Sequence, residues 1–95
     1  MELIKGRLTK DIQVTGKLEI LVSYEGKEKL IIIQKNNTIL KLRELIMQSF
    51  NLKTNFTMYN TNMKREITFF EEEDFTVNAM PCSIKGPSIY IRKAI

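Results

Sequence analysis

The chain has 95 residues, of which 43% are hydrophobic and 27% are charged. This length allows one domain with one hydrophobic core, and the composition is that of a globular protein rather than a disordered segment. The chain contains no histidine, and Cys82 is its only cysteine. These counts exclude an internal disulfide, a cysteine-based metal cluster within one chain and the catalytic arrangements that use histidine. We therefore expect a protein without enzymatic activity, metal or cofactor.

The net charge is +4, but the acidic residues are unevenly spread, since residues 71–74 are all acidic and leave a strongly basic remainder. The longest apolar run, residues 30–33, is too short to span a bilayer. Residues 1–5 lack the long apolar core of a secretory signal. We expect an intracellular protein, cytoplasmic or nuclear, that does not insert into a membrane.

The first half of the chain predicts a β-hairpin. Residues 1–16 alternate loosely and predict an N-terminal arm or an extra edge strand, which Gly16 ends. From residue 17 the alternation is clear, with Leu18, Ile20 and Val22 on the side opposite Leu21. Gly26 supplies a turn, and residues 29–35 form a second strand that is apolar on both faces.

The central segment predicts a helix. Asn37 or Thr38 is placed to cap its first turn, because their side chains accept hydrogen bonds from free backbone N–H groups. Apolar residues then recur at three- and four-residue steps, which makes a stripe that faces a core. The stripe comprises Ile39, Leu42, Ile46 and Phe50. We expect the helix to end near residues 49–51, with Leu52 folding back onto it.

The remaining residues predict short strands and turns. Residues 56–59 form a third strand, residues 60–62 an asparagine-rich turn and residues 64–68 a fourth strand. Residues 69–75 predict a short helical turn that directs Phe70 and Phe75 inward. A loop over residues 78–87 contains two prolines and a glycine, and residues 88–92 close the chain as a strand.

The expected elements follow one another in the order strand, strand, helix, strand, strand, turn, strand. This order indicates an α+β fold with one helix across one face of a mixed four- to five-stranded sheet. A right-handed crossover through the helix sets either the third or the last strand beside the first. Over about residues 17–93 the chain resembles the ubiquitin-like β-grasp superfamily, and we expect a domain of this fold to span residues 17–95. The resemblance rests on the LEILVSYEGKEKLIIIQ hairpin, the NTILKLRELIMQSF helix, the FTMY strand and the SIYIRK strand. It implies a non-catalytic adaptor or interaction domain that binds another protein.

Three groups within that superfamily are similar in part. Phox-and-Bem-type interaction domains look similar through EITFFEEEDF, and this resemblance implies that the acidic run binds a lysine of a partner. The acidic hairpin motif usual in those domains is replaced by residues 60–64, which read NTNMK. Ras-associating domains use a basic second strand, which Lys27, Lys29 and Lys35 supply here. Doublecortin-type domains are basic and bind microtubules.

The outer face of the hairpin is one candidate binding surface. If Leu18, Ile20 and Val22 face the helix, Leu21 points outward, and we expect Ile31 or Ile33 to lie beside it as an exposed apolar patch. The alternative is that the N-terminal arm covers this patch through Leu8 or Ile12. Burial of such residues gives reversible binding of a protein partner. We also expect a lysine of the second strand, Lys29, to contact the partner.

The acidic run is the second candidate, and its members Glu71, Glu72, Glu73 and Asp74 are expected to steer a basic partner. The alternative interpretation is a solvated loop that separates phenylalanines. A different function, binding of RNA or the acidic surface of a microtubule, would use a basic hairpin surface. That surface would consist of Lys27, Lys29, Lys35, Lys64 and Arg65. Cys82 is expected to be a small buried residue rather than a reactive thiol.

Overall fold

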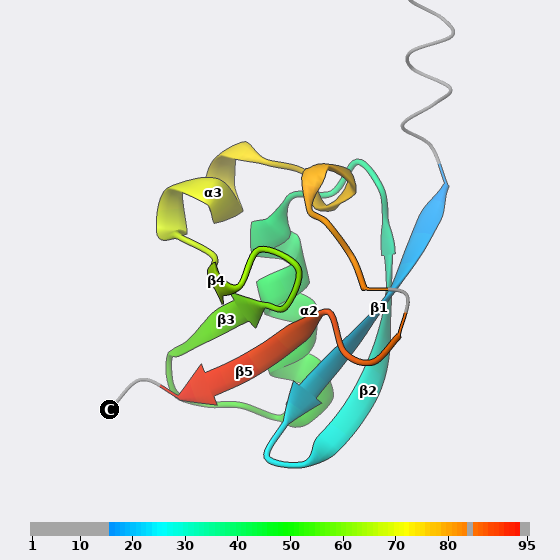
Figure 1. The fold of residues 1–95 in the computed structure, drawn as a ribbon. Coiled ribbons are helices and arrows are strands. Elements are labelled where there is room, and N and C mark those ends of the chain that lie inside the picture. The colour runs from blue at the N-terminus through cyan, green and yellow to red at the C-terminus, as the bar shows by residue number, and fades with distance from the viewer. Residues whose placement is uncertain (1–15, 84, 94–95) are drawn as a thin grey trace, which may run out of the picture.

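The computed structural model describes residues 16–83 and 85–93, in which five strands form one mixed sheet. The strands are β1 (Lys17–Tyr24), β2 (Lys27–Gln34), β3 (Phe56–Asn60), β4 (Arg65–Glu66) and β5 (Ile89–Lys93). Their spatial order is β2-β1-β5-β3-β4. Helix α2 (Ile39–Phe50) lies behind the sheet in Figure 1. The expected α+β class with a mixed sheet is therefore confirmed.

The first hairpin has a two-residue loop. Glu25 and Gly26 both have positive φ angles, 50° and 80°, as the hairpin turn that matches the twist of the strands requires. The loop fixes the register because Tyr24 must pair with Lys27, and Ile20 consequently pairs with Ile31. The predicted arm of residues 1–16 lies, apart from Gly16, outside the described residues.

Both ends of helix α2 lie within the residue ranges that the sequence predicted. The Thr38 side chain accepts a hydrogen bond from the Lys41 backbone N–H at 3.2 Å. At the other end Asn51 adopts a left-handed conformation with φ 54°. The Leu52 N–H then donates to the Met47 carbonyl at 2.9 Å, which closes the helix in a Schellman turn.

The last strand, β5, occupies the centre of the sheet. It pairs parallel with β1 and antiparallel with β3, so the last strand rather than the third lies beside the first. Strand β4 is shorter than the predicted residues 64–68 and pairs with β3 only at two positions. The crossover through α2 separates β2 from β3 and places these strands in different halves of the sheet.

The hydrophobic core lies between the inner face of the sheet and α2. It contains the predicted helix residues Ile39, Leu42 and Ile46, all buried. The sheet and the later segments add further buried side chains. These are Ile20, Val22, Ile31, Ile33, Phe56, Met58, Ile67, Val77, Met80, Ile89 and Ile91. Leu18, Tyr24, Phe50 and Leu52 are partly buried at its border.

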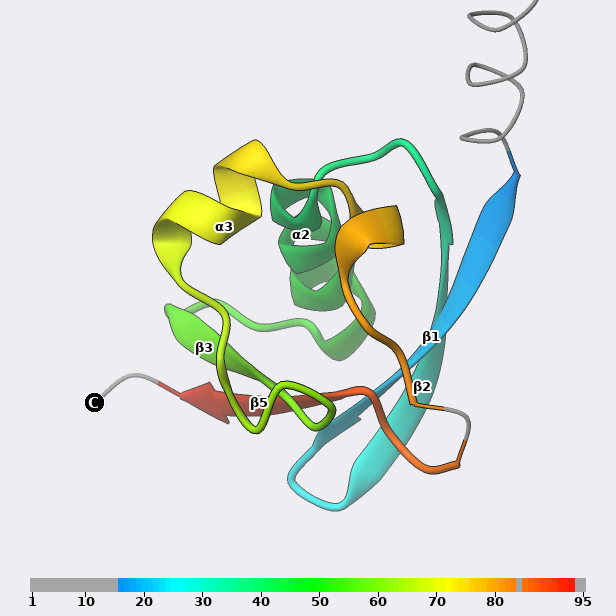
Figure 2. The ribbon, with the colours of Figure 1, turned by 45° about the horizontal axis from the view of Figure 1, so that its top comes forward.

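Two short helical elements follow β4. Helix α3 (Phe69–Asp74) and a 3-10 turn (Val77–Ala79) lie on either side of α2 in Figure 2. Backbone hydrogen bonds attach the segment between them to the start of α2. Ile39 donates to the Phe75 carbonyl at 3.0 Å, and Val77 donates to the Asn37 carbonyl at 2.8 Å.

The turn after β3 depends on one buried side chain, Asn60. Its Oδ1 accepts from the backbone N–H groups of Asn62 and Met63, both at 2.9 Å, and its Nδ2 donates to the Pro81 carbonyl at 3.0 Å. The predicted asparagine turn is confirmed. In addition, Asn60 attaches the loop around Pro81 to the end of the sheet.

Candidate functional site

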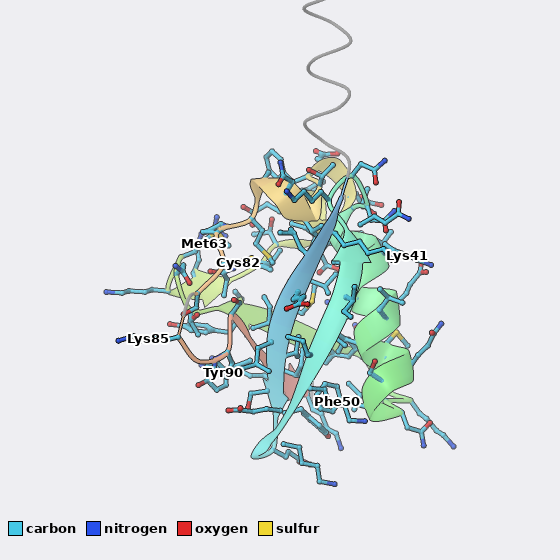
Figure 3. The ribbon with its side chains drawn as sticks, turned by 90° about the vertical axis from the view of Figure 1, so that its right-hand side faces the viewer. Lys41, Phe50, Met63, Cys82, Lys85 and Tyr90 are labelled. Atoms are coloured by element: carbon cyan, nitrogen blue, oxygen red, sulfur yellow. The ribbon has the colours of Figure 1, made fainter. Side chains whose placement is uncertain are left out.

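The face of the sheet opposite α2 carries an apolar patch, called here the open-face patch and formed by Leu21, Leu30, Ile32 and Tyr90. Leu30 and Ile32 on β2 are 53% and 56% exposed. Leu21 on β1 lies directly opposite Leu30, and Tyr90 on β5 lies opposite Ser23, two residues farther along β1. In Figure 3, Tyr90 lies on the side of the sheet away from α2, whereas Phe50 lies beside the helix. Four apolar side chains on three strands thus share one exposed surface.

The structure corrects the expected members of this patch. Ile31 and Ile33 are core residues, because the register that pairs Ile20 with Ile31 directs both toward α2. The expectation that they are exposed beside Leu21 is wrong, and Leu30 and Ile32 take that position. Leu21 does face away from the helix, as predicted, although it is half-buried by its neighbours.

Lys29 also lies on the helix side of the sheet rather than on the open-face patch. Its ammonium group donates to the Ser49 carbonyl in the last turn of α2 and lies 5.2 Å from the centroid of the Phe50 ring. A cation is favourable at this position because the last carbonyls of a helix lack intrahelical donors and carry partial negative charge. Lys29 therefore has a contact within the domain that the sequence did not indicate.

The open face carries both signs of charge. Its outward positions include Glu19, Glu28 and Glu66, and two basic residues, Lys17 and Arg92. The Arg92 guanidinium lies 4.7 Å from the centroid of the Tyr59 ring. This mixture distinguishes the open face from a basic surface, and it surrounds the open-face patch with polar side chains.

The acidic run is divided between internal and exposed positions. Glu72 is buried, and it accepts hydrogen bonds from Arg43 Nε at 2.6 Å and Nη2 at 2.9 Å. Glu71 accepts from both Nη atoms of Arg65, at 2.8 and 2.7 Å. The prediction that all four acids face a partner is therefore wrong for Glu72, which is enclosed, whereas Glu73 and Asp74 are exposed.

Glu71 has a second function in its own helix. Its side chain accepts from the Thr68 backbone N–H at 2.9 Å while Thr68 Oγ1 accepts from the Glu71 N–H at 3.2 Å, which is a capping box. The hydrogen bonds from Arg65 and then from the Thr68 backbone lower the pKa of Glu71 from 4.5 to about 2. Glu71 therefore fixes the start of α3.

The phenylalanines of this segment are exposed, so the expectation that Phe70 and Phe75 point inward is wrong. Glu72 is buried against Arg43, so Phe70, two residues earlier in the helix, lies on the opposite and exposed side, whereas Phe75 lies beyond the last residue of α3 and is 50% exposed. Phe75 nevertheless lines a hollow of about 230 Å³, called here the α3 hollow. Its other lining residues are Ile39, Met63, Ile67, Glu71, Ala79, Met80 and Pro81.

The basic residues that the sequence grouped into one hairpin surface do not gather. Lys27 and Lys29 belong to β2 and Arg65 belongs to β4, and these strands form opposite edges of the sheet. Arg65 is also paired with Glu71. The residues assigned to a polyanion surface therefore lie on separate parts of the molecule.

Cys82 is half-buried and packs against the core. Burial raises the pKa of its thiol, opposed by a hydrogen bond with Ser88. Within residues 16–83 and 85–93, no helix has the length and apolar character needed to cross a membrane. Among these residues, acidic and cysteine side chains also form no group of three that could hold a metal ion.

Comparisons with protein-family models, curated proteins and solved structures found no significant match. A proposal about function must therefore be based on the two surfaces described above, the open-face patch and the α3 hollow. The open-face patch was predicted in position but with the wrong β2 residues. The α3 hollow was not predicted, although Thr68 and Glu71 have the spacing of a capping box and could have indicated how α3 begins.

Proposed function

We propose that this domain is a non-catalytic protein interaction module that recruits a partner through the open-face patch. The observation that carries the proposal is the exposure of two large aliphatic side chains, Leu30 and Ile32, beside Leu21 and Tyr90. Contiguous apolar patches on a soluble domain usually mark contact surfaces. The polar surroundings of the patch match the common arrangement of an apolar centre and a polar rim.

The position of β2 adds a second means of binding. β2 is an edge strand, and no other strand among the described residues pairs with its outer side. Because the two-residue loop makes Tyr24 and Lys27 a hydrogen-bonded pair, alternation along the strand turns the backbone groups of Leu30 and Ile32 outward. A partner could therefore combine backbone hydrogen bonds with apolar contacts at the same two residues.

We further propose that the fold belongs to the ubiquitin-like β-grasp superfamily. Three features of the described residues support this proposal: the parallel central pair β1 and β5, the hairpin before the helix, and the placement of one long helix, α2, across one face of the sheet. The mixed charge of the open face favours a protein partner over RNA or a microtubule surface, since three glutamates there would repel a polyanion.

The proposal is tested with Leu30→Asp and Ile32→Asp variants. Both residues are exposed, so we expect the circular dichroism spectrum and the melting temperature to stay close to those of the wild type. Proteins captured from the native source by the wild type and lost by both variants are the candidate partners. With a purified partner, each variant is expected to weaken binding about tenfold to a hundredfold.

Gln34→Asp is the matched control, because it adds the same charge on the same face without removing an apolar side chain. The partner should bind this control nearly normally. Binding by Leu30→Asp and Ile32→Asp as tight as by the wild type would refute the proposal. A steep fall of affinity with salt would instead support the polyanion alternative.

A further inference from the structure

The outer edge of β2 presents backbone groups in a repeating pattern. Alternate residues of β2 bond to β1, so the N–H and carbonyl groups of Leu30 and Ile32 point away from β1. No other strand among residues 16–83 and 85–93 pairs with this edge. Backbone groups in this arrangement are a template for an added strand. A protein segment in extended conformation would supply donors and acceptors at the matching spacing.

The side chains on the two sides of this edge differ in character. On the open face, Leu30 and Ile32 are the exposed apolar residues already described. On the side of α2, the exposed Lys27 lies at the start of the strand. The half-buried Lys35 follows the end of β2, where its N–H donates to the Gly16 carbonyl at 2.9 Å and continues the pairing with the chain before β1. The edge therefore has an apolar centre on one side and a lysine toward each end on the other.

The two lysines are placed symmetrically about Ile31. Lys27 precedes Ile31 by four residues and Lys35 follows it by four, and side chains at even spacing in a strand share one face. Among the described residues, neither lysine forms an ion pair. A strand added with its centre at Ile31 would meet one lysine toward each end, whichever way it runs. Parallel and antiparallel partners are therefore subject to the same charge requirement.

We propose that the outer edge of β2 binds an extended segment of another protein whose apolar side chains face Leu30 and Ile32 and whose acidic side chains face Lys27 and Lys35. This inference rests on the proposed function, because it uses the same two apolar residues, and it specifies the shape and charge of the partner. The apolar contacts supply most of the affinity, and the acidic side chains select the register. A shift by one residue would turn the apolar side chains of the segment toward α2.

Backbone geometry and charge together disfavour other occupants. A nucleic acid has no series of amide donors and carbonyl acceptors at strand spacing, and the glutamates of the open face would repel it. A second copy of this chain would offer lysines where the site requires acids. An acidic extended protein segment is the occupant that satisfies both the backbone groups and the lysines.

The probe for the experiment is the synthetic peptide Glu-Thr-Glu-Ile-Thr-Ile-Glu-Thr-Glu with blocked ends. It reads the same in both directions, so it fits either strand orientation. A second peptide has lysine in place of each glutamate. Hydrogen exchange measured by NMR on the full chain should show the amides of Leu30 and Ile32 slowed about tenfold or more by the glutamate peptide. The amide of Ile31 already bonds to β1 and should change less, and the lysine peptide should have no effect.

Methylation of peptide nitrogens tests the added strand without changing the domain. If the peptide runs antiparallel to β2, its isoleucine N–H groups bond to the edge and those of its central threonine face solvent. If it runs parallel, these two positions exchange their roles. We therefore expect N-methylation of the isoleucines or N-methylation of the central threonine, but not both, to abolish binding. The peptide that loses binding also identifies the orientation.

Charge reversal on the domain tests the role of the lysines. The double variant Lys27→Glu, Lys35→Glu should bind the glutamate peptide about tenfold more weakly and should bind the lysine peptide instead. Lys27→Glu alone, at the exposed lysine, should weaken binding about threefold, which keeps the test valid if the change at Lys35 disturbs folding. Lys85→Glu is the matched control, because Lys85 is exposed and lies well to the left of β2 in Figure 3. It should bind the glutamate peptide normally.

Three results would overturn the inference. One is equal binding of the glutamate and lysine peptides, and another is binding by both methylated peptides. The third is slow exchange of the Leu30 and Ile32 amides in the free protein. A dependence of that exchange on protein concentration would identify a second copy as the occupant, and independence would identify another part of the same chain.

Failure of this inference can be distinguished from failure of the proposed function. A natural partner that is lost by Leu30→Asp but does not slow exchange of the Ile32 amide would still bind the open-face patch. That result would overturn the added strand alone. A partner that binds Leu30→Asp and Ile32→Asp normally would overturn the proposed function as well.

Discussion

The pair formed by Arg43 and Glu72 is the most informative target for a stability experiment. Arg43 makes two hydrogen bonds to the buried Glu72 carboxylate, a third at 3.2 Å to the Asn55 side chain, and lies 4.4 Å from the centroid of the Phe56 ring. Replacement of Arg43 by leucine leaves the carboxylate enclosed without a partner. Breaking a buried pair in this way costs about 3–5 kcal/mol.

That loss is large for this domain, because proteins of this size unfold with about 5–15 kcal/mol. Urea unfolding followed by circular dichroism should show the midpoint of Arg43→Leu lowered by about 2 M or more. In the double variant Arg43→Leu, Glu72→Leu no charge remains buried, so most of the lost stability should return. The exposed variant Lys41→Leu is the control and should change stability by less than about 0.5 kcal/mol.

The double-mutant cycle tests the reasoning directly. The structure predicts a coupling free energy between Arg43 and Glu72 of about 1–3 kcal/mol. Additive losses in the double variant, or a cost of less than about 1 kcal/mol for Arg43→Leu, would show that the pair does not determine the position of α3.

Three further measurements test other parts of the structure. The lowered pKa of Glu71 means that its contribution to stability is complete above pH 4.5 and is lost as the pH falls toward 2, so Glu71→Gln should flatten the loss of stability over that range in urea titrations. The raised pKa and partial burial of Cys82 predict slow reaction with a thiol reagent at neutral pH, accelerated by urea; fast reaction in the native state would contradict this. Ile46→Ala should cost about 2–4 kcal/mol, because Ile46 is fully buried, whereas Met47→Ala on the exposed side of α2 should cost less than about 1 kcal/mol.

The elements with a single clear periodicity were predictable from the sequence. The stripe of Ile39, Leu42 and Ile46, with a cap expected at Asn37 or Thr38 and an end expected near residues 49–51, located the helix, and the structure shows Thr38 as its cap. In β1 only one parity is consistently apolar, so its core side was correct. Each of these segments has only one orientation that buries its apolar residues, and the structure shows that orientation.

β2 was predicted with the wrong side exposed, because residues 30–33 are apolar at every position and alternation alone cannot orient them. The turn contained the missing information. A two-residue loop at Glu25 and Gly26 pairs Tyr24 with Lys27, and continuing that register pairs Ile20 with Ile31. The core side of β2 could thus have been derived from the turn and β1 together.

The error at α3 has a different cause. Its orientation depends on Arg43, which lies 29 residues earlier in the chain, and on Arg65 in β4. Burial of an ion pair cannot be read from local periodicity, which favours phenylalanine over glutamate inside. The α3 hollow depends on that orientation and on the Asn60 bond to Pro81, so it was not foreseeable from the sequence.

The outer edge of β2, with which no other described strand pairs, also bears on the solubility of the free domain. In the antiparallel alignment that sets Leu30 of one molecule opposite Ile32 of another, Lys27 of each falls opposite Lys35 of the other, and the repulsion opposes edge-to-edge aggregation. This protection is electrostatic, so high ionic strength or acetylation of these lysines would weaken it. A cell that makes this domain in excess of its partner would depend on those four ammonium groups to keep it dispersed.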